Sequence, residues 1–154
     1  MQYNLYKPNS KNTGAVFSFK VISKTKNGEP TVPTFLVECL KQAKWDDDKK
    51  TASFSENSGN PEKNIFVKLN EVEIGGLLNA IERYQEFSAY HTFNEDKTTI
   101  SFKPYTKQNG AQAFSFSIIK NQTMKFGIGI ELSEARTLKS FMEMFLFEFF
   151  SFKK

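Results

Sequence analysis

Residues 64–81, NIFVKLNEVEIGGLLNAI, decide the fold, because the spacing of their apolar residues changes partway along. Ile65, Val67 and Leu69 occupy every second position, which indicates a half-buried strand. After Asn70 the apolar residues recur at the spacing of an amphipathic helix. A strand is therefore predicted to lead directly into a helix.

Asn70 has a side chain suited to the start of this helix. Its amide oxygen can accept a hydrogen bond from an unpaired amide of the first turn, and Glu71 and Glu73 suit the positive end of the helix dipole. The predicted apolar face consists of Ile74, Leu77, Leu78, Ile81 and Tyr84. Gly75 and Gly76 fall inside the helix, where close packing is the simplest explanation for them.

The same change of spacing occurs again near the C-terminus, where Ser133 is predicted to cap a second helix. A shift of 63 residues aligns Leu69 with Leu132, Asn70 with Ser133 and Leu78 with Phe141. This is a repeat of pattern with little identity.

Outward from these two junctions, alternation and turn residues predict four strands before each helix. They cover residues 14–24, 33–42, 51–56 and 64–69 in the first unit, and 87–93, 98–106, 112–120 and 124–130 in the second. The prediction is one α+β domain over residues 1–154, with two antiparallel four-stranded sheets, each followed by a helix. Residues 1–12 are predicted as a polar leader, 14–86 as the first unit and 87–152 as the second.

Bulk composition limits the classes of protein to consider. The net charge of +4 is a weak hint of a polyanionic partner, whereas seventeen phenylalanines are unusual. Cys39 is the sole cysteine, so it cannot form an intramolecular disulfide, and a buried apolar role is expected. No signal or transit peptide and no membrane span is seen, so a cytoplasmic protein of a bacterium or infected host cell, without a membrane partner, is expected.

Several segments are similar to those of a known family. They are TGAVFSFKV (13–21), TFLVECL (34–40) followed by Trp45, IFVKLNEVEIGGLLNAI (65–81), ISFKPY (100–105), AFSFSIIK (113–120) and GIGIELSEARTLKSFM (127–142). With the order of strands and helices, they resemble the Whirly family of single-stranded DNA-binding proteins, whose relatives include phage single-strand binders and kinetoplastid mitochondrial RNA-binding proteins.

The first strand departs from that family's pattern. Asn12, Thr13 and Gly14 stand where the family has Lys-Gly-Lys, and only Ala15 and Ser18 match the later positions of its motif. The phage branch, where the motif is looser, is therefore the closer analogy.

The resemblance implies a protein that binds single-stranded DNA with little sequence preference during DNA replication, recombination or repair. Two alternatives remain open. One is an RNA-binding protein of the same fold, and the other is a purely structural assembly protein.

Sequence-independent binding of a single strand needs cations for phosphates and flat rings for bases. If Phe35, Val67, Phe102, Phe116 and Ile128 face the helices, lysines alternating with them fall on the opposite sheet faces. The predicted phosphate-binding residues are Lys20, Lys41, Lys44, Lys68, Lys103, Lys107 and Lys125, and the predicted stacking residues are Trp45, Phe54, Phe66, Tyr90 and Tyr105. The alternatives are a solvated strand face for the lysines and a tryptophan packed under its own loop.

The last helix is apolar on more than one side, which requires cover on more than one side. Phe141, Phe145 and Phe149 form one stripe, and Met142, Leu146 and Phe150 form a neighbouring one. We expect a second copy of the chain to cover part of it, and the resemblance implies a homotetramer. The alternative is a helix buried within one chain.

Catalysis is not expected. His91 is the sole histidine and has no nucleophile motif in view, and Asp46, Asp47 and Asp48 lack the ligand spacing of a calcium loop. The prediction is a non-enzyme without cofactor or metal.

Overall fold

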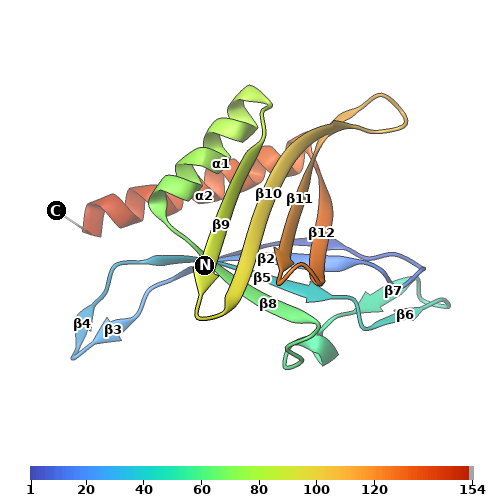
Figure 1. The fold of residues 1–154 in the computed structure, drawn as a ribbon, viewed down its shortest axis with the longest axis horizontal. Helices are drawn as coiled ribbons and strands as arrows, with labels where there is room; N and C mark the ends of the chain where they lie inside the picture. The colour runs from blue at the N-terminus through green and yellow to red at the C-terminus, as the bar shows by residue number, and fades with distance from the viewer. Residues whose placement is uncertain (153–154) are drawn as a thin grey trace.

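The computed structural model describes residues 1–152, which form two four-stranded antiparallel sheets with a helix after each (Figure 1). The first sheet has the order β1 (Gln2–Lys7), β2 (Ala15–Ile22), β5 (Thr34–Lys41), β8 (Asn64–Leu69), and α1 (Glu71–Arg83) follows it. The second has the order β12 (Met124–Glu131), β11 (Gln112–Lys120), β10 (Asp96–Thr106), β9 (Phe87–Phe93), and α2 (Leu132–Phe152) follows it. The predicted α+β layout is confirmed.

Two predictions about the first unit are wrong. The supposed polar leader contains β1, which pairs with β2 from Gln2 opposite Lys20 to Lys7 opposite Ala15. Leu5 is its one aliphatic residue, so its alternation is weak in the sequence.

The predicted strand at 51–56 is not part of the sheet either. Its first half is β7 (Thr51–Ser53), which pairs with β6 (Lys44–Asp46) in a separate hairpin, and a short 3₁₀ helix, η1 (Ser55–Asn57), follows. A second small hairpin, β3 (Thr25–Lys26) with β4 (Glu29–Pro30), surrounds the predicted Asn27–Gly28 turn. Both central residues of that turn have positive φ, at 53° and 78°.

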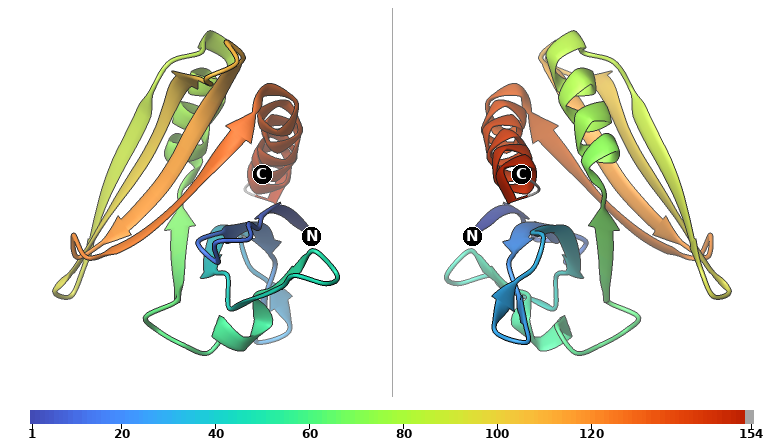
Figure 2. Two further views of the ribbon diagram at one scale, coloured as in Figure 1. Left: turned by 90° about the vertical axis from the view of Figure 1, so that its right-hand side faces the viewer. Right: turned by 90° about the vertical axis from the view of Figure 1, so that its left-hand side faces the viewer.

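Phenylalanine rings join the two sheets. Phe17 and Phe19 of β2 lie 5.3 and 6.0 Å, between ring centroids, from Phe116 of β11. The second sheet stands across the first, and both helices lie on its inner side (Figure 2). As predicted, Phe35, Val67, Phe102, Phe116 and Ile128 are all buried.

The start of α1 has the predicted cap. The Glu73 amide donates to Asn70 Oδ1 at 2.8 Å, and the Asn70 amide donates to Glu73 Oε1 at 3.0 Å, which completes a capping box. The start of α2 differs from the prediction, because the helix already begins at Leu132 and Ser133 lies within it. There the Glu134 carboxylate accepts from the amide of Glu131 at 3.0 Å.

Most of the predicted intersubunit face of α2 lies in the chain's own core. Phe141, Met142, Phe145 and Phe149 are buried, and Leu146 packs against the core. Phe35 accounts for part of this burial, since its ring lies 5.8 Å from Phe141 and 5.4 Å from Phe145. Of the six, Phe150 alone is exposed, and it shares the solvent side of the helix with Met144 and Phe147. Phe141, Met142, Phe145 and Phe149 are thus buried within the chain, and Phe150 stays open to a second chain.

Cys39 is fully buried in this core, as expected. Loss of hydration raises the pKa of its thiol well above the ordinary value. Among residues 1–152, no helix is long and apolar enough to cross a membrane.

The two helical glycines differ in what surrounds them. A Cβ on Gly76 would lie 2.4 Å from Cε2 of Phe87, whereas a Cβ on Gly75 meets nothing within 4 Å. Gly76 therefore lets β9 approach α1 closely, as expected, but Gly75 has no such role.

We predict that Gly76→Ala lowers the free energy of unfolding by about 1–3 kcal/mol, because the methyl group forces Phe87 out of place. Gly75→Ala should raise it by up to about 1 kcal/mol, because alanine favours the helix. Urea denaturation of both variants tests this, and equal effects at the two positions would contradict it.

Candidate nucleic-acid interface

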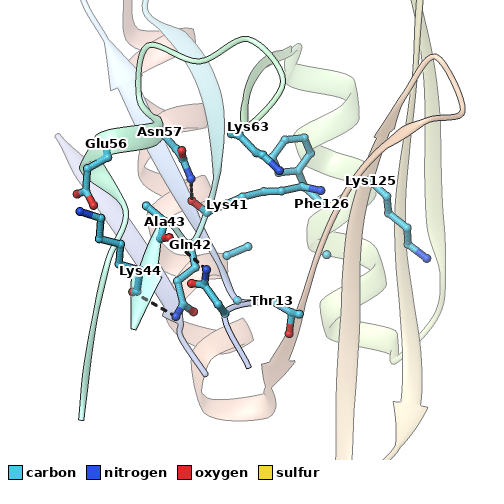
Figure 3. A pocket seen from close by; sticks show the side chains of 14 residues that line it. Thr13, Lys41, Gln42, Ala43, Lys44, Glu56, Asn57, Lys63, Lys125 and Phe126 are labelled. Atoms are coloured by element: carbon cyan, nitrogen blue, oxygen red, sulfur yellow. Dashed lines mark hydrogen bonds between the residues drawn. The ribbon is translucent and has the colours of Figure 1, made fainter. Parts of the chain in front are cut away.

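A basic groove of about 570 Å³ opens between one end of the first sheet and β12 (Figure 3). Lys41, Lys44, Lys63 and Lys125 line it, and Glu56 is the one carboxylate among its lining residues. Lys41 ends β5, Lys63 precedes β8, and Lys125 lies on β12. The groove thus gathers positive charge from distant parts of the sequence.

The charges in the basic groove are largely uncompensated. Lys41 Nζ lies 5.3 Å from the ring centroid of Phe126, and Lys41, Lys63 and Lys125 form no ion pair within residues 1–152. Glu56 accepts hydrogen bonds from Ser53 at 2.7 Å and Ser55 at 3.1 Å. The bond from Ser53 is the main cause that lowers the pKa of Glu56.

Gln42 fixes the wall of this groove. Its buried amide accepts from the Asn9 backbone N–H at 3.0 Å and donates to the Asn9 carbonyl at 2.9 Å. Gly14 lies against the same amide, and a Cβ there would be 2.3 Å from the carbonyl of Lys7. The loop before β2 is therefore held tightly, and its Asn12, Thr13 and Gly14 line the groove.

We predict that Gln42→Ala lowers the free energy of unfolding by about 2 kcal/mol, because two backbone groups lose their partner. Hydrogen exchange of the Asn9 amide should accelerate more than exchange in β10. Gln108, an exposed glutamine, supplies the control Gln108→Ala, which should change neither. Unchanged exchange at Asn9 in Gln42→Ala would contradict the assignment.

The outer face of the second sheet, which points away from the helices, carries a row of small residues. The strand register aligns Ser88, Ser101, Ser117 and Gly127 in one row across all four strands. Beside this row runs a shallow groove of about 450 Å³, lined by Tyr105, Ser115, Ser117, Lys125, Gly127, Ile128 and Gly129. Lys125 and Gly127 also line the basic groove, so the two grooves meet at β12.

The aromatic residues of this outer face are accessible. Tyr105 is 39% exposed and Tyr90 is 59% exposed. Tyr105 leans across Gly129, since a Cβ there would be 2.8 Å from its hydroxyl oxygen. Lys103 is exposed on the same face and has no ion-pair partner among the described residues. Tyr105 and Lys125 thus line one groove, whereas Tyr90 and Lys103 share this face but do not line that groove.

Three predicted binding residues are engaged elsewhere. Lys20 pairs with Glu38 at 2.6 Å, and Phe54 contacts Tyr6 edge-on, with 6.0 Å between the ring centroids. Lys107 pairs with Glu131 at 2.9 Å, and this hydrogen bond raises the pKa of Lys107 and lowers that of Glu131.

Trp45 lies apart from both grooves, on β6. Its indole N–H donates to Asp47 Oδ1 at 3.4 Å, and it lines a hollow with Lys44, Lys49 and two aspartates. The stacking role predicted for Trp45 therefore stays a prediction at a hollow that holds both lysines and aspartates. Asp46 serves the turn, where it accepts from the amides of Asp48 and Lys49 at 3.0 and 3.1 Å.

Phe66 and Lys68 line a separate cleft of about 510 Å³ between β8 and the β9–β10 hairpin. Phe93 lines it too and is 76% exposed, whereas Phe66 is 56% exposed. Phe93 and Lys63 were not predicted. The sequence does contain a signal for Phe93, because a ring at the end of a strand, next to the turn at Asn94, is expected to be exposed. It contains none for Lys63, whose position depends on tertiary structure.

His91, the sole histidine, contacts the start of α1. His91 Nε2 lies 2.5 Å from Glu73 Oε2, so the histidine links β9 to the cap of α1. In the described part of the chain, no three potential metal ligands cluster.

Protein-family models, curated proteins and solved structures were all compared with the chain, and none matches it.

Proposed function

We propose that this protein is a Whirly-like, phage-type single-stranded DNA-binding protein with little sequence preference, acting in DNA replication, recombination or repair. The observation that carries the proposal is that Lys41, Lys63 and Lys125 all line one groove and have no ion-pair partner among residues 1–152. Unpaired cations along a groove suit the phosphates of a flexible strand.

The exposed rings supply the second component of such a site. Tyr105 and Tyr90 offer faces for bases on the outer face of the second sheet, and Phe66 of β8 with Phe93 of β9 offers another pair at the cleft between these strands. A base stacked on an aromatic ring contributes about 1–3 kcal/mol whatever its identity. Low sequence preference follows from this mode of contact.

We predict that Lys41→Ala combined with Lys63→Ala reduces the slope of log affinity against log salt by about 1.4, or about 0.7 per lost phosphate contact. Fluorescence anisotropy of labelled oligothymidine over a salt series measures this slope. Lys20→Ala is the matched control, because Lys20 is already paired with Glu38, and it should leave the slope unchanged.

Two outcomes would redirect the proposal. Stronger competition by an RNA oligomer than by the matched DNA would favour the RNA-binding alternative. Absence of salt-dependent binding at low ionic strength would contradict nucleic-acid binding and favour a purely structural assembly protein.

We also propose that the chain forms a homotetramer through its helices, as the family resemblance implies. Of the six residues expected from the sequence, Phe150 supports this, and Met144 and Phe147 join it. Met144, Phe147 and Phe150 lie on the solvent side of α2, and Phe147 is 74% exposed. Burial of such rings against another chain is favourable because it removes apolar surface from water.

We predict that Phe147→Glu combined with Phe150→Glu yields a single chain in light scattering, because buried carboxylates would be left without partners. Phe93→Glu is the control, since Phe93 is equally exposed but lies on β9. A single-chain mass for the unmodified protein at micromolar concentration would contradict self-association.

A further inference from the structure

Gly127 lies where the basic groove meets the outer face of the second sheet. It is exposed on β12, an edge strand, and it lines both grooves. Lys125, two residues earlier on the same side of the strand, also lines both. Phe126, between them, faces the opposite side and packs beneath Lys41 (Figure 3).

The fold itself gives no reason for a glycine at this position. A Cβ on Gly127 would lie 3.8 Å from the Phe116 carbonyl oxygen and from Ser117 Cβ, which is ordinary contact, and its φ is not in the left-handed region. Gly129 differs, because a Cβ there would press on Tyr105. A glycine inside a strand weakens it, and such residues often mark places where a ligand comes close to the backbone.

The charges on the two sides of Gly127 suit a polyanion. On one side are Lys41, Lys63 and Lys125 with a single carboxylate, Glu56. On the other side, no carboxylate lines the shallow groove, whose floor of Ser115 and Ser117 ends at the ring of Tyr105. Cations, the open backbone of β12 and the exposed ring of Tyr105 on β10 thus follow one another across this edge of the sheet.

We infer that a bound single strand crosses β12 at Gly127. The phosphates of the strand contact Lys125 and the other lysines of the basic groove. The strand passes over the exposed protein backbone at Gly127, and one of its bases stacks on Tyr105. This inference rests on the proposed function and adds the path of the strand to it.

Gly127→Val tests the path without disturbing the fold. Valine favours strands, so the melting temperature should be unchanged or higher, while its side chain blocks the crossing. Binding of an oligothymidine of about 12 nucleotides should weaken about tenfold or more at low salt. Ser117→Val places a larger side chain next to Gly127 and should also weaken binding.

Ser88→Val is the matched control. Ser88 lies in the same row as Gly127 but on the other edge strand, about 14 Å away at the usual strand spacing. The variant introduces the same residue on the same face of the sheet but far from the crossing point. Affinity should therefore stay within about twofold of the unmodified protein.

The outcomes separate the path from the function. Unchanged affinity in both Gly127→Val and Ser117→Val would overturn the path while the unmodified protein still binds. A clear loss of melting temperature in Gly127→Val would overturn it too, because the fold would then need the glycine. If the unmodified protein shows no salt-dependent binding, the proposed function and the path both fail.

Discussion

The contact of Phe116 with Phe17 and Phe19 is the constraint on which the rest of the structure depends. Each sheet has one apolar face, and a single sheet of this size cannot exclude water from that face alone. Joining the sheets through these rings buries both faces at once. The two helices then close the core, where Phe35 meets Phe141 and Phe145.

This arrangement also decides where polar groups can gather. With the inner faces buried, the lysines of the strands lie on the outer faces or at the line where the sheets meet. That line brings the end of β5 and the start of β8 close to β12, and the basic groove forms there. Because its lysines come from strands far apart in the sequence, the groove exists only when both sheets are in place.

The sequence predicted those features that depend on local spacing. Alternation placed Phe35 and Phe116 in the core, and the change of period at Asn70 located α1 and its cap. Features that depend on pairing between distant segments were not predictable. The ion pair of Lys20 with Glu38 needs the register of β2 on β5, and Lys63 acquires its neighbours only through tertiary structure.

The apolar pattern of α2 was also only partly sufficient to predict its packing. Its two apolar stripes correctly indicate cover on more than one side, but spacing alone does not say which stripe meets the chain's own core. Phe145 turned inward because Phe35 lies opposite it, and Phe147 was left outside. The composition shows how many aromatic rings the protein has. Which rings of α2 face the core and which face solvent depends on how the sheets pack.

The distribution of charge gives the molecule two ends. Glu71, Glu73 and Glu82 lie on α1, and Glu82 faces Lys139 of α2 at 3.4 Å, so the helical end offers a polyanion little attraction. Lys41, Lys63 and Lys125, which have no ion-pair partner in the described part of the chain, lie beside β12. A nucleic-acid strand held there would leave the exposed side of α2 uncovered. The proposed binding of a strand and the proposed association of chains are therefore compatible, because they would use different surfaces of the fold.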